Sequence, residues 1–543
     1  MNVCNPCLTL MTLIAYSTSP SYGASISGTV KGPDGAALKG VFVQAQNKKT
    51  LITYTVLSAD QGNYRLENIP AGEYTLSTKV TGFRSDPLTG VNLTADPIAA
   101  SFDMSLRKAP VHWNEVSIYQ AGKLWPASPV KDKIFATCFT CHGFQTRMAT
   151  MPRDAADWRN RVQYMQVSME FGLADRLTDQ QADDIATYLT SLFSEDSVLP
   201  RSPEEAAGYK DTVRPISGEA MNIAYVEYDM PSPSRMPFSA APAKDGHFWI
   251  PNFGVANKIS RLDPNTGEMQ DYLVPNNGTA AVHSAVPAAD GSVWLTEQGS
   301  NKLGQWDPHT RRIIEFQDAY VPGKLGYGAG SKHTVRFDPD GNVWASGNPL
   351  TRLDRKTKKF TRFDDILSAY DVKEDNNGNI WFTRPDTSQI GMVDWKTLKV
   401  SLWTPPTPKS FPRRMEIDTD GIVWFGEFNA GKIGRFDPKT RTFTEYPLPG
   451  PEPTPYGLGI DADHHIWYSS YNMDVLGRFD PKTGKTVEYP FPHSENTIRE
   501  FIRDAQGRMW YGSPSNNKVG YFTLTSGAEG TGNKNSTTAK LAN

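Results

Sequence analysis

Short runs of apolar and polar residues recur along the second half of the chain with a long, regular period. A typical unit reads Asp-Gly-x-(Val/Ile)-Trp-(Phe/Tyr), then Lys-(Ile/Leu/Val)-Gly-(Arg/Gln/Tyr)-(Phe/Trp)-Asp-Pro, then Glu-Tyr-Pro. Each unit holds four short strand patterns with turn residues between them, as one blade of a β-propeller requires. We therefore expect a seven-bladed β-propeller over residues 221–524. The copies, about 43 residues long, are marked by Trp249, Trp294, Trp344, Trp381, Trp424, Trp467 and Trp510.

The two ends of the repeat region complement each other. The last copy stops after its third strand pattern, Lys518–Leu524, whereas Ile223–Pro231 precedes the first copy and matches the fourth-strand pattern of Phe443–Pro449. We expect one blade to take strands from both ends, which would close the ring and leave no free sheet edge. Residues 525–543 are rich in Gly, Asn and Thr and are expected to be disordered.

Two further patterns precede the repeats. Residues 25–107 alternate apolar and polar positions in short runs separated by Gly-containing turns, which predicts a small antiparallel β-sandwich. Residues 130–199, between linkers at 108–129 and 200–220, have helical periodicity. The fold class is therefore multidomain and mainly β, with a small α-helical domain between sandwich and propeller. The helical inner positions are Trp158, Val162, Met165 and Met169, then Ile185, Leu189 and Leu192 in a second helix that Thr178 can cap.

Composition and charge narrow the function classes. In 543 residues, 44 Gly, 40 Pro and 13 Trp suit many short strands and turns, and 56 basic against 59 acidic side chains predict no nucleic-acid partner. The apolar run Leu8–Tyr16, followed by small residues, predicts a secretory signal over residues 1–24, with a buried N-terminal strand as the alternative. No later segment has the roughly 18 uninterrupted apolar residues that span a bilayer. We expect a periplasmic or secreted protein with no transmembrane segment in the mature chain.

The segment Cys138-Phe-Thr-Cys141-His142 carries the most specific chemistry in the chain. C-x-x-C-H is the attachment motif of a c-type haem, in which the thiols bond the porphyrin and the adjacent histidine is the proximal iron ligand. Cys4 and Cys7 fall in the signal, so the mature chain has no disulfide framework. The alternatives are a thioredoxin-like redox pair or half of a zinc site, but no second C-x-x-C completes a zinc set.

The sixth iron ligand is harder to assign than the fifth. A methionine thioether is common at this position in electron-transfer cytochromes. Met165 lies on the expected inner face of its helix, and we choose it, although methionine also serves as core filler.

The repeats can be compared with one another, and this comparison locates the central channel. The residue eleven places before each blade tryptophan should lie at the channel mouth, where a ring of functional side chains could bind a ligand or perform acid/base chemistry, or simply line a polar channel. A second ring, three places after each tryptophan, includes Glu297 and Glu427. The first ring reads Phe238, His283, His333, Tyr370, Arg413, Tyr456 and Arg499.

Three resemblances accompany these patterns. The run from Gly28 through Gly62-Asn-Tyr-Arg-Leu to Tyr74 resembles the carboxypeptidase regulatory-like family, which implies a non-catalytic accessory domain. The order of Trp158, Met165 and Tyr188 resembles single-haem cytochrome c domains. The blade motif, as in Asp420–Glu427 followed by Gly431–Pro438, resembles the streptogramin (virginiamycin B) lyase family across the propeller.

The lyase resemblance implies elimination by a histidine base and a divalent metal held by glutamates. His283 and Glu297 match the spacing of one such pair, but the acid expected two residues before the base is Ala281, or Ser331 if His333 is matched.

Taken together, the motifs favour an exported haem c electron-transfer protein, with the channel ring binding a small-molecule substrate or a redox partner protein. It could be a subunit of an oxidoreductase. The alternatives are a metal-dependent lyase with an appended cytochrome, and a non-catalytic binding or sensory module.

Overall fold

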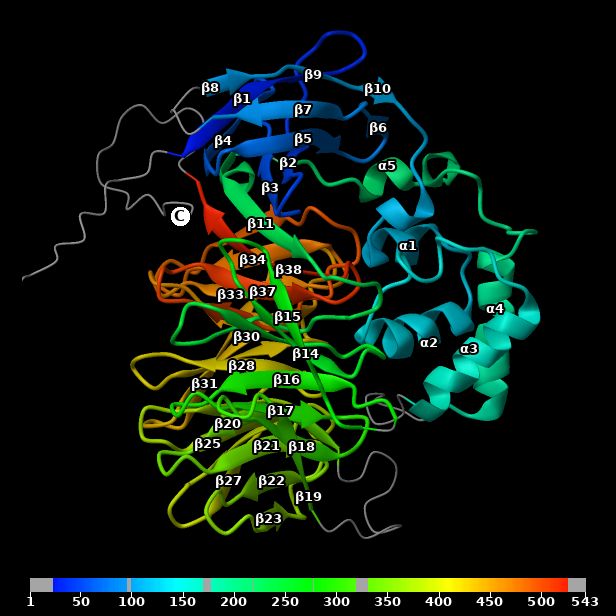
Figure 1. The fold of residues 1–543 in the computed structure, drawn as a ribbon. Helices are drawn as coiled ribbons and strands as arrows, with labels where there is room; N and C mark the ends of the chain where they lie inside the picture. Colours follow the sequence, from blue (N-terminus) through cyan, green and yellow to red (C-terminus); the bar gives the residue numbers. More distant parts are fainter. Residues whose placement is uncertain are drawn as a thin grey trace, which may run out of the picture.

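The computed structural model describes residues 23–94, 99–168, 177–216, 218–276, 278–318 and 331–525. The expected signal up to residue 22, Met169 and the expected tail beyond residue 525 lie outside these ranges. A β-rich N-terminal region, a group of helices and a propeller-like stack of sheets follow one another along the chain (Figure 1). Within the described ranges, no helix combines the length and the apolar character needed to cross a bilayer.

The N-terminal region is sandwich-like, as expected. One sheet has the order β4-β1-β8, with β9 also on β1, and the other has β3-β2-β5-β7. Ile26, Val43 and Leu76 face the interior and are fully buried. Gly62 has φ +72°, and a Cβ there would lie 2.5 Å from the Val30 carbonyl oxygen, so this turn requires glycine. The strands are β1 Ala24–Lys31, β2 Phe42–Asn47, β3 Thr53–Leu57, β4 Asn63–Ile69, β5 Gly72–Lys79, β6 Phe83–Arg84, β7 Leu88–Leu93, β8 Ala99–Ser101, β9 Met104–Ser105 and β10 Arg107–Lys108.

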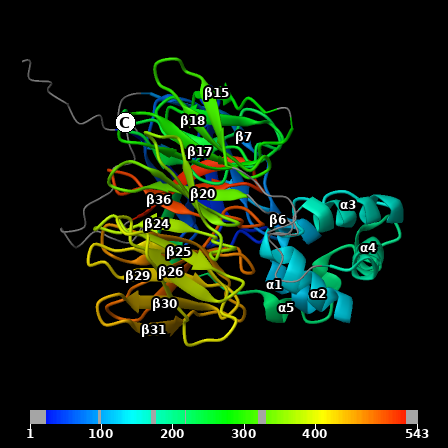
Figure 2. The same cartoon turned by 90° about the horizontal axis from the view of Figure 1, so that it is seen from below.

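The helical region packs around one apolar cluster that contains Trp125, Phe144 and Trp158. Thr178 caps α4 as expected: its hydroxyl accepts from the Gln181 N–H at 3.2 Å, and the Gln181 side chain accepts from the Thr178 N–H at 3.0 Å. The α-helices are α1 Ile118–Leu124, α2 Pro129–Thr137, α3 Ala155–Ser168, α4 Asp179–Phe193 and α5 Tyr209–Thr212, and the 3-10 turns are η1 Trp113–Glu115, η2 Cys138–Thr140, η4 Pro203–Glu205 and η5 Gly218–Met221. In both views the helices lie beside the propeller sheets (Figures 1 and 2).

Six antiparallel four-stranded sheets follow one another from β12 to β35. They comprise β12 Ala241–Pro242, β13 Phe248–Pro251, β14 Lys258–Leu262 and β15 Met269–Leu273; β16 Val282–Pro287, β17 Val293–Glu297, β18 Lys302–Trp306 and β19 Ile313–Gln317; β20 Lys332–Phe337, β21 Val343–Gly347, β22 Leu350–Leu353 and β23 Phe360–Phe363; β24 Val372–Glu374, β25 Ile380–Arg384, β26 Gln389–Val393 and β27 Val400–Trp403; β28 Pro412–Ile417, β29 Val423–Glu427, β30 Lys432–Asp437 and β31 Thr442–Pro447; and β32 Pro455–Ile460, β33 Ile466–Ser470, β34 Val475–Phe479 and β35 Thr486–Pro490.

A repeated hydrogen bond explains the Asp-to-Trp spacing of the blade motif. In the later sheets the indole N–H donates to an aspartate six residues earlier, whose carboxylate also accepts backbone N–H groups of the intervening turn. The first two copies have Ala243 and Ala288 at this position. The pairs are Trp344–Asp338, Trp381–Asp375, Trp424–Asp418, Trp467–Asp461 and Trp510–Asp504, at 2.7–3.0 Å.

The last sheet joins the two ends of the repeat region. β36 (Phe501–Arg503), β37 (Met509–Ser513) and β38 (Lys518–Leu524) continue into β11 (Ile223–Asp229), with Ile223 opposite Leu524. The other edge of β11 pairs with β3 of the sandwich, so one eight-stranded sheet runs through both regions. The sequence predicted the closing strand, but it did not predict its second partner.

Candidate functional site

The structure brings the seven predicted channel-mouth residues together. His283 lies in β16 and His333 in β20, and their rings are tilted by 34° with centroids 3.6 Å apart. Tyr370 lies just before β24, and its ring centroid is 4.3 Å from that of His333. Phe238 lies just before β12, and its ring centroid is 4.7 Å from that of His283. The two imidazoles are 3% and 7% exposed, and both ring nitrogens of His283 lack a hydrogen-bond partner among the described residues.

Two tyrosines and two arginines complete this ring. The hydroxyls of Tyr370 and Tyr456 are hydrogen-bonded to each other, and Arg499 Nη1 donates to Tyr456 at 2.9 Å. The Arg413 guanidinium lies over the Tyr456 ring, 4.4 Å from its centroid. Burial raises the pKa of Tyr456, but the Arg499, Arg413 and Arg414 charges outweigh it and leave the pKa below its ordinary value. Burial moves the pKa values of His283 and His333 well below the ordinary value, so both rings are neutral.

Residues 138–146, the haem-motif segment, begin with the C-x-x-C-H motif and lie against this ring. Arg413 Nη1 donates to the Thr140 carbonyl at 2.8 Å, and Arg499 Nη2 donates to the Cys141 carbonyl at 2.7 Å. The predicted ring therefore contacts the chain's own C-x-x-C-H segment. The sequence indicated that these arginines could be functional, but it did not indicate this contact, because the contacting residues are more than 270 positions apart.

A glutamate that the sequence did not single out fixes the same segment from the propeller side. Glu495 accepts from the Gly143 N–H at 3.2 Å, and from the N–H and hydroxyl of Thr146 at 2.7 Å each. It is fully buried. Glu495 lies outside the repeated blade motif, so no internal comparison could have pointed to it.

Cys138, Cys141 and His142 are the residues that would hold a covalently attached haem c. The free thiol of Cys138 begins the short η2 turn, and that of Cys141 follows the turn. Nδ1 of His142 lies 2.7 Å from the Gly143 carbonyl oxygen, so Nδ1 carries the proton and Nε2 keeps its lone pair. Burial, and next the Arg147 charge, lower the pKa of His142, which favours the neutral imidazole that binds metals. Burial raises the pKa of the Cys138 thiol to about 12, and aromatic residues surround it.

Met165, the predicted sixth ligand, lies in α3 and is half-buried. The apolar cluster that Cys138 contacts includes Met148 among its half-buried members and does not include Met165. The ligand assignment stays a prediction.

Glu297 lies in β17, where its backbone pairs with Val282, the neighbour of His283. Its carboxylate accepts from the Ser300 hydroxyl at 2.7 Å rather than meeting the imidazole. Burial, and next the Glu315 carboxylate acting against the Ser300 hydrogen bond, raises the pKa of Glu297 to about 7. No cluster of three or more His, Cys, Asp or Glu side chains suited to a metal occurs among the described residues. The divalent-metal site also stays a prediction.

Below the ring, buried ion pairs occupy the inner strands. Glu500 accepts from Arg336 at 2.6 Å and from Lys373 at 3.1 Å, and Arg414 pairs with Asp371 at 3.0 Å. Lys373 also pairs with Glu416. This charged cluster adjoins the ring, because Arg414 and Glu500 directly follow Arg413 and Arg499 in the sequence.

Comparisons with known families support two of the three regions. Residues 324–531 match the virginiamycin B lyase family, and residues 25–107 match the carboxypeptidase regulatory-like domain. Neither match includes residues 130–199, so the cytochrome c assignment of that region stays a prediction. No curated protein matches the chain.

Solved structures agree on the propeller. The chain resembles a streptogramin B lyase structure with a TM-score of 0.51 at 23% identity, over 57% of this chain and 100% of that one. It also resembles catalytically inactive virginiamycin B lyase from Staphylococcus aureus with quinupristin, with a TM-score of 0.50 at 23% identity, over 56% of this chain and 99% of that one. At such identity the likeness supports the fold and leaves the reaction open. The protein is thus a mainly β, multidomain protein, in which a carboxypeptidase regulatory-like domain precedes a virginiamycin B lyase-like propeller along the chain.

Proposed function

We propose that this chain is an exported haem c electron-transfer protein whose propeller holds the haem-binding segment over its own central channel. The observation that carries the proposal is the contact of Arg413 and Arg499 with the carbonyls of Thr140 and Cys141, inside the C-x-x-C-H motif. Hydrogen bonds from charged donors each contribute about 1.5–3 kcal/mol. Such a contact fits a fixed junction better than a transient encounter between two tethered domains.

A haem bound here would supply a one-electron redox centre. Cys138 and Cys141 would anchor it, and His142 would present Nε2 because Gly143 holds its other nitrogen. The neutral, adjacent rings of His283 and His333 and the paired tyrosines would then form the polar face of the channel nearest this segment. That face would meet a small substrate or a group of a redox partner.

The same proposal includes the number of blades and the location of the protein. The six four-stranded sheets and the sheet of β36, β37, β38 and β11 would form the seven blades of one closed ring. Export to the periplasm or beyond follows from the apolar run Leu8–Tyr16 and from the motif, because bacterial c-type haem is attached outside the cytoplasmic membrane.

Haem attachment is tested by producing the full chain with a haem-ligation system. We expect a Soret band, and a denatured polypeptide heavier than the bare chain by one haem. Cys138→Ala combined with Cys141→Ala removes the added mass, whereas His142→Ala keeps the mass and changes the absorption spectrum. A matured preparation with neither a Soret band nor added mass would falsify the proposal.

Electron transfer is tested by following the haem absorption band of the holoprotein in the presence of candidate small-molecule donors and reduced cytochromes. Reduction by one class of donor identifies the substrate or partner. Arg478→Gln, on the outer side of the last complete sheet, is the control and leaves the reduction rate unchanged.

The family match supports a second candidate, a metal-dependent lyase-like activity. Residues 324–531 carry that match, and His283, which precedes them, would serve as the base. Titration with Mg²⁺ and Mn²⁺ decides between the candidates. Tight binding that is lost in both His283→Ala and Glu297→Ala favours the lyase, and no binding discards it.

A further inference from the structure

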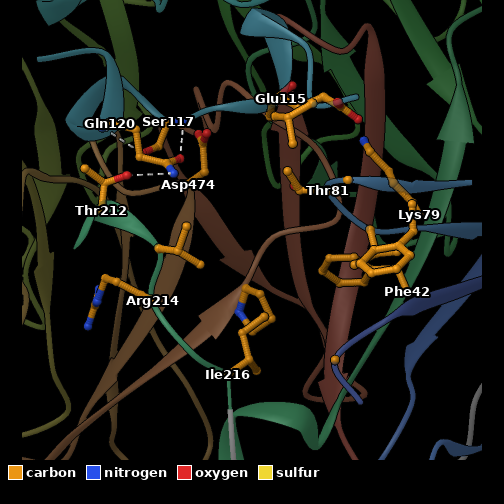
Figure 3. Close-up of a pocket in the computed structure, with 18 of the residues that line it drawn as sticks. Phe42, Lys79, Thr81, Glu115, Ser117, Gln120, Thr212, Arg214, Ile216 and Asp474 are labelled. Carbon is orange, nitrogen blue, oxygen red and sulfur yellow. Dashed lines mark hydrogen bonds between the residues drawn. The ribbon is translucent and has the colours of Figure 1, made fainter. Parts of the chain in front are cut away.

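A cavity of about 1080 Å³ lies where the three regions of the chain meet (Figure 3). Its walls come from β2 and β5 of the sandwich, from α1, α5 and the segment after α5, and from the propeller loops around Asp474 and His493. Small-molecule sites have volumes of this order and often lie between domains. None of the features assigned above uses this cavity.

One wall of the cavity is apolar. Phe42 of the sandwich and Phe491 of the propeller belong to a single buried cluster, and Ile216 packs against it. All three line the cavity. This wall can accept the apolar part of a ligand.

Most charged groups that line the cavity already have partners. Glu115 pairs with Arg84, Glu488 with Arg214, and Lys39 with Asp60. Asp474 accepts from the Asn496 N–H at 2.6 Å. Glu115, Glu488 and Lys39 are thus paired with opposite charges, and Asp474 is hydrogen-bonded to a backbone amide.

Lys79 is different. Its side chain extends from beside Phe42 toward Glu115 (Figure 3), and it forms no direct ion pair with another described residue, since Glu115 pairs with Arg84. Its Nζ has one hydrogen-bond partner in the described part of the chain, Nδ1 of His493 at 3.4 Å. The side chain is exposed to solvent, and the Glu227, Asp474 and Glu115 carboxylates oppose the desolvation that lowers the pKa of its ammonium group. An anion bound in the cavity would give Nζ a direct ion-pair partner.

The structure holds the partner of Lys79 in place. Glu227 is fully buried, and its carboxylate accepts from Nε2 of His493 at 2.7 Å and from the Tyr511 hydroxyl at 3.0 Å. Nε2 therefore carries the imidazole proton, and Nδ1 accepts from the Lys79 ammonium. Glu227 lies in β11, the strand that joins the sandwich to the propeller. The Lys79 ammonium group, which the sandwich contributes, is thus oriented by His493, which Glu227 of the propeller holds in place.

We propose that this cavity binds a small amphipathic anion. A carboxylate or phosphate group would bind the two remaining N–H donors of Lys79, and an apolar part would lie against Phe42, Ile216 and Phe491. The site is separate from the haem-motif segment and does not depend on haem attachment.

Isothermal titration of the full chain with 1-anilinonaphthalene-8-sulfonate tests the charge. Lys79→Met weakens binding of this probe about tenfold or more, the change expected from losing about 1.4 kcal/mol. Lys79→Arg keeps most of the affinity. Lys39→Met is the matched control, because that lysine lines the same cavity but pairs with Asp60, and it leaves the affinity unchanged.

A neutral probe and a blocked cavity test the location. N-phenyl-1-naphthylamine binds wild type and Lys79→Met equally, since it carries no anion. Ile216→Trp fills the apolar wall and weakens both probes, while its circular dichroism and melting temperature show that the chain is folded. Equal binding of the sulfonate by wild type and Lys79→Met, or no effect of Ile216→Trp, overturns the proposal.

Competition identifies the anionic group. Octanoate and octyl phosphate are each titrated against the bound sulfonate probe, with octanol as the uncharged control. Displacement by either anion and not by octanol supports the site and assigns its headgroup. Displacement by neither anion overturns it.

Discussion

Single side chains of the propeller fix the haem-motif segment, and Glu495 shows how. Its carboxylate is the acceptor for the amides of Gly143 and Thr146, and it is shielded from water. A buried amide that loses its acceptor carries a desolvation cost, whereas an exposed ion pair contributes little. The segment is therefore held by a few buried contacts rather than by the surface pairs around it.

Glu495→Ala is expected to speed hydrogen exchange at the Gly143 and Thr146 amides by about tenfold or more, because hydrogen bonds to charged groups contribute about 1.5–3 kcal/mol. Exchange followed by mass spectrometry on peptides that span residues 138–146 measures the effect. Glu452→Ala removes the exposed bridge to Lys123 and serves as the control. Unchanged protection in Glu495→Ala would show that the segment does not rely on this carboxylate.

Glu427 makes the stability of the propeller depend on pH. Both carboxylate oxygens are buried without a hydrogen-bond partner among the described residues, and burial with the nearby Glu445 raises the pKa to about 8. The unfolded value is about 4.3. Between these two pKa values the Glu427 carboxyl keeps its proton in the folded state and loses it in the unfolded state. The free energy of unfolding therefore falls as the pH rises.

Glu427→Gln is therefore expected to gain stability over wild type at pH 8 and to gain little at pH 4.5. Denaturant unfolding at both pH values, in the same salt, measures the difference. Glu268→Gln, an exposed residue of a turn in the first sheet, is the control. A Glu427→Gln difference that is equal at the two pH values would contradict the raised pKa.

At the scale of elements, the Asp-to-Trp bond fixes the turn between the first two strands in the later sheets. Asp338 accepts from Trp344, Asn342 and Arg352, and it is buried, whereas Asp340 in the same turn is exposed. Loss of Asp338 leaves a buried indole N–H without its acceptor, which costs about 1–3 kcal/mol.

We expect Asp338→Ala to lower the free energy of unfolding by that amount and Asp340→Ala to change it by less than about 0.5 kcal/mol. Chemical unfolding followed by tryptophan fluorescence compares the two variants. Similar values for both would show that the Asp-to-Trp bond is not what stabilises the turn.

Much at this scale could be predicted from the sequence, because repeats and helix caps are local signals. The Trp spacing located the strands, and Thr178 marked the start of α4. His283 and His333 occupy equivalent positions in their repeats, which indicated that the two side chains lie close together. By contrast, Glu297 was paired with His283 on spacing alone, and its contact with Ser300 depends on which way a side chain turns at the end of a strand.

Contacts between regions could not be predicted in this way. Alternating positions in Thr53–Leu57 indicate a strand but not its neighbour, and β11 was expected to pair with the last strand only. The contacts of Arg413 and Arg499 with the haem-motif segment are likewise set by packing between regions, for which one sequence carries no periodic signal.

At the scale of the whole molecule, the sandwich and the propeller share both a sheet and a core. Ala224–Glu227 of β11 pair with Thr53–Val56 of β3, and Val56 and Val226 lie in one buried cluster. Regions joined in this way are expected to lose their structure together.

Scanning calorimetry is accordingly expected to show no separate low-temperature transition for the sandwich. Val56→Asp, which places a charge in the shared core, lowers the temperature of the main transition. Leu88→Asp, at an exposed position in the edge strand β7, does not. A variant of Val56 that melts the sandwich and leaves the propeller transition in place would show that the two regions unfold independently.

The double pairing of β11 also bears on the order in which the chain is made. β3 precedes β11 along the chain and β36, β37 and β38 come last, so an exported chain delivers these strands in that order. Without β3, both edges of the ring-closing strand would stay unpaired until the six following sheets had formed. Unpaired strand edges can pair with other chains. Because β3 is already present, one edge of β11 can be occupied from the moment it appears. The accessory domain thus shields the nascent propeller until its final strand arrives.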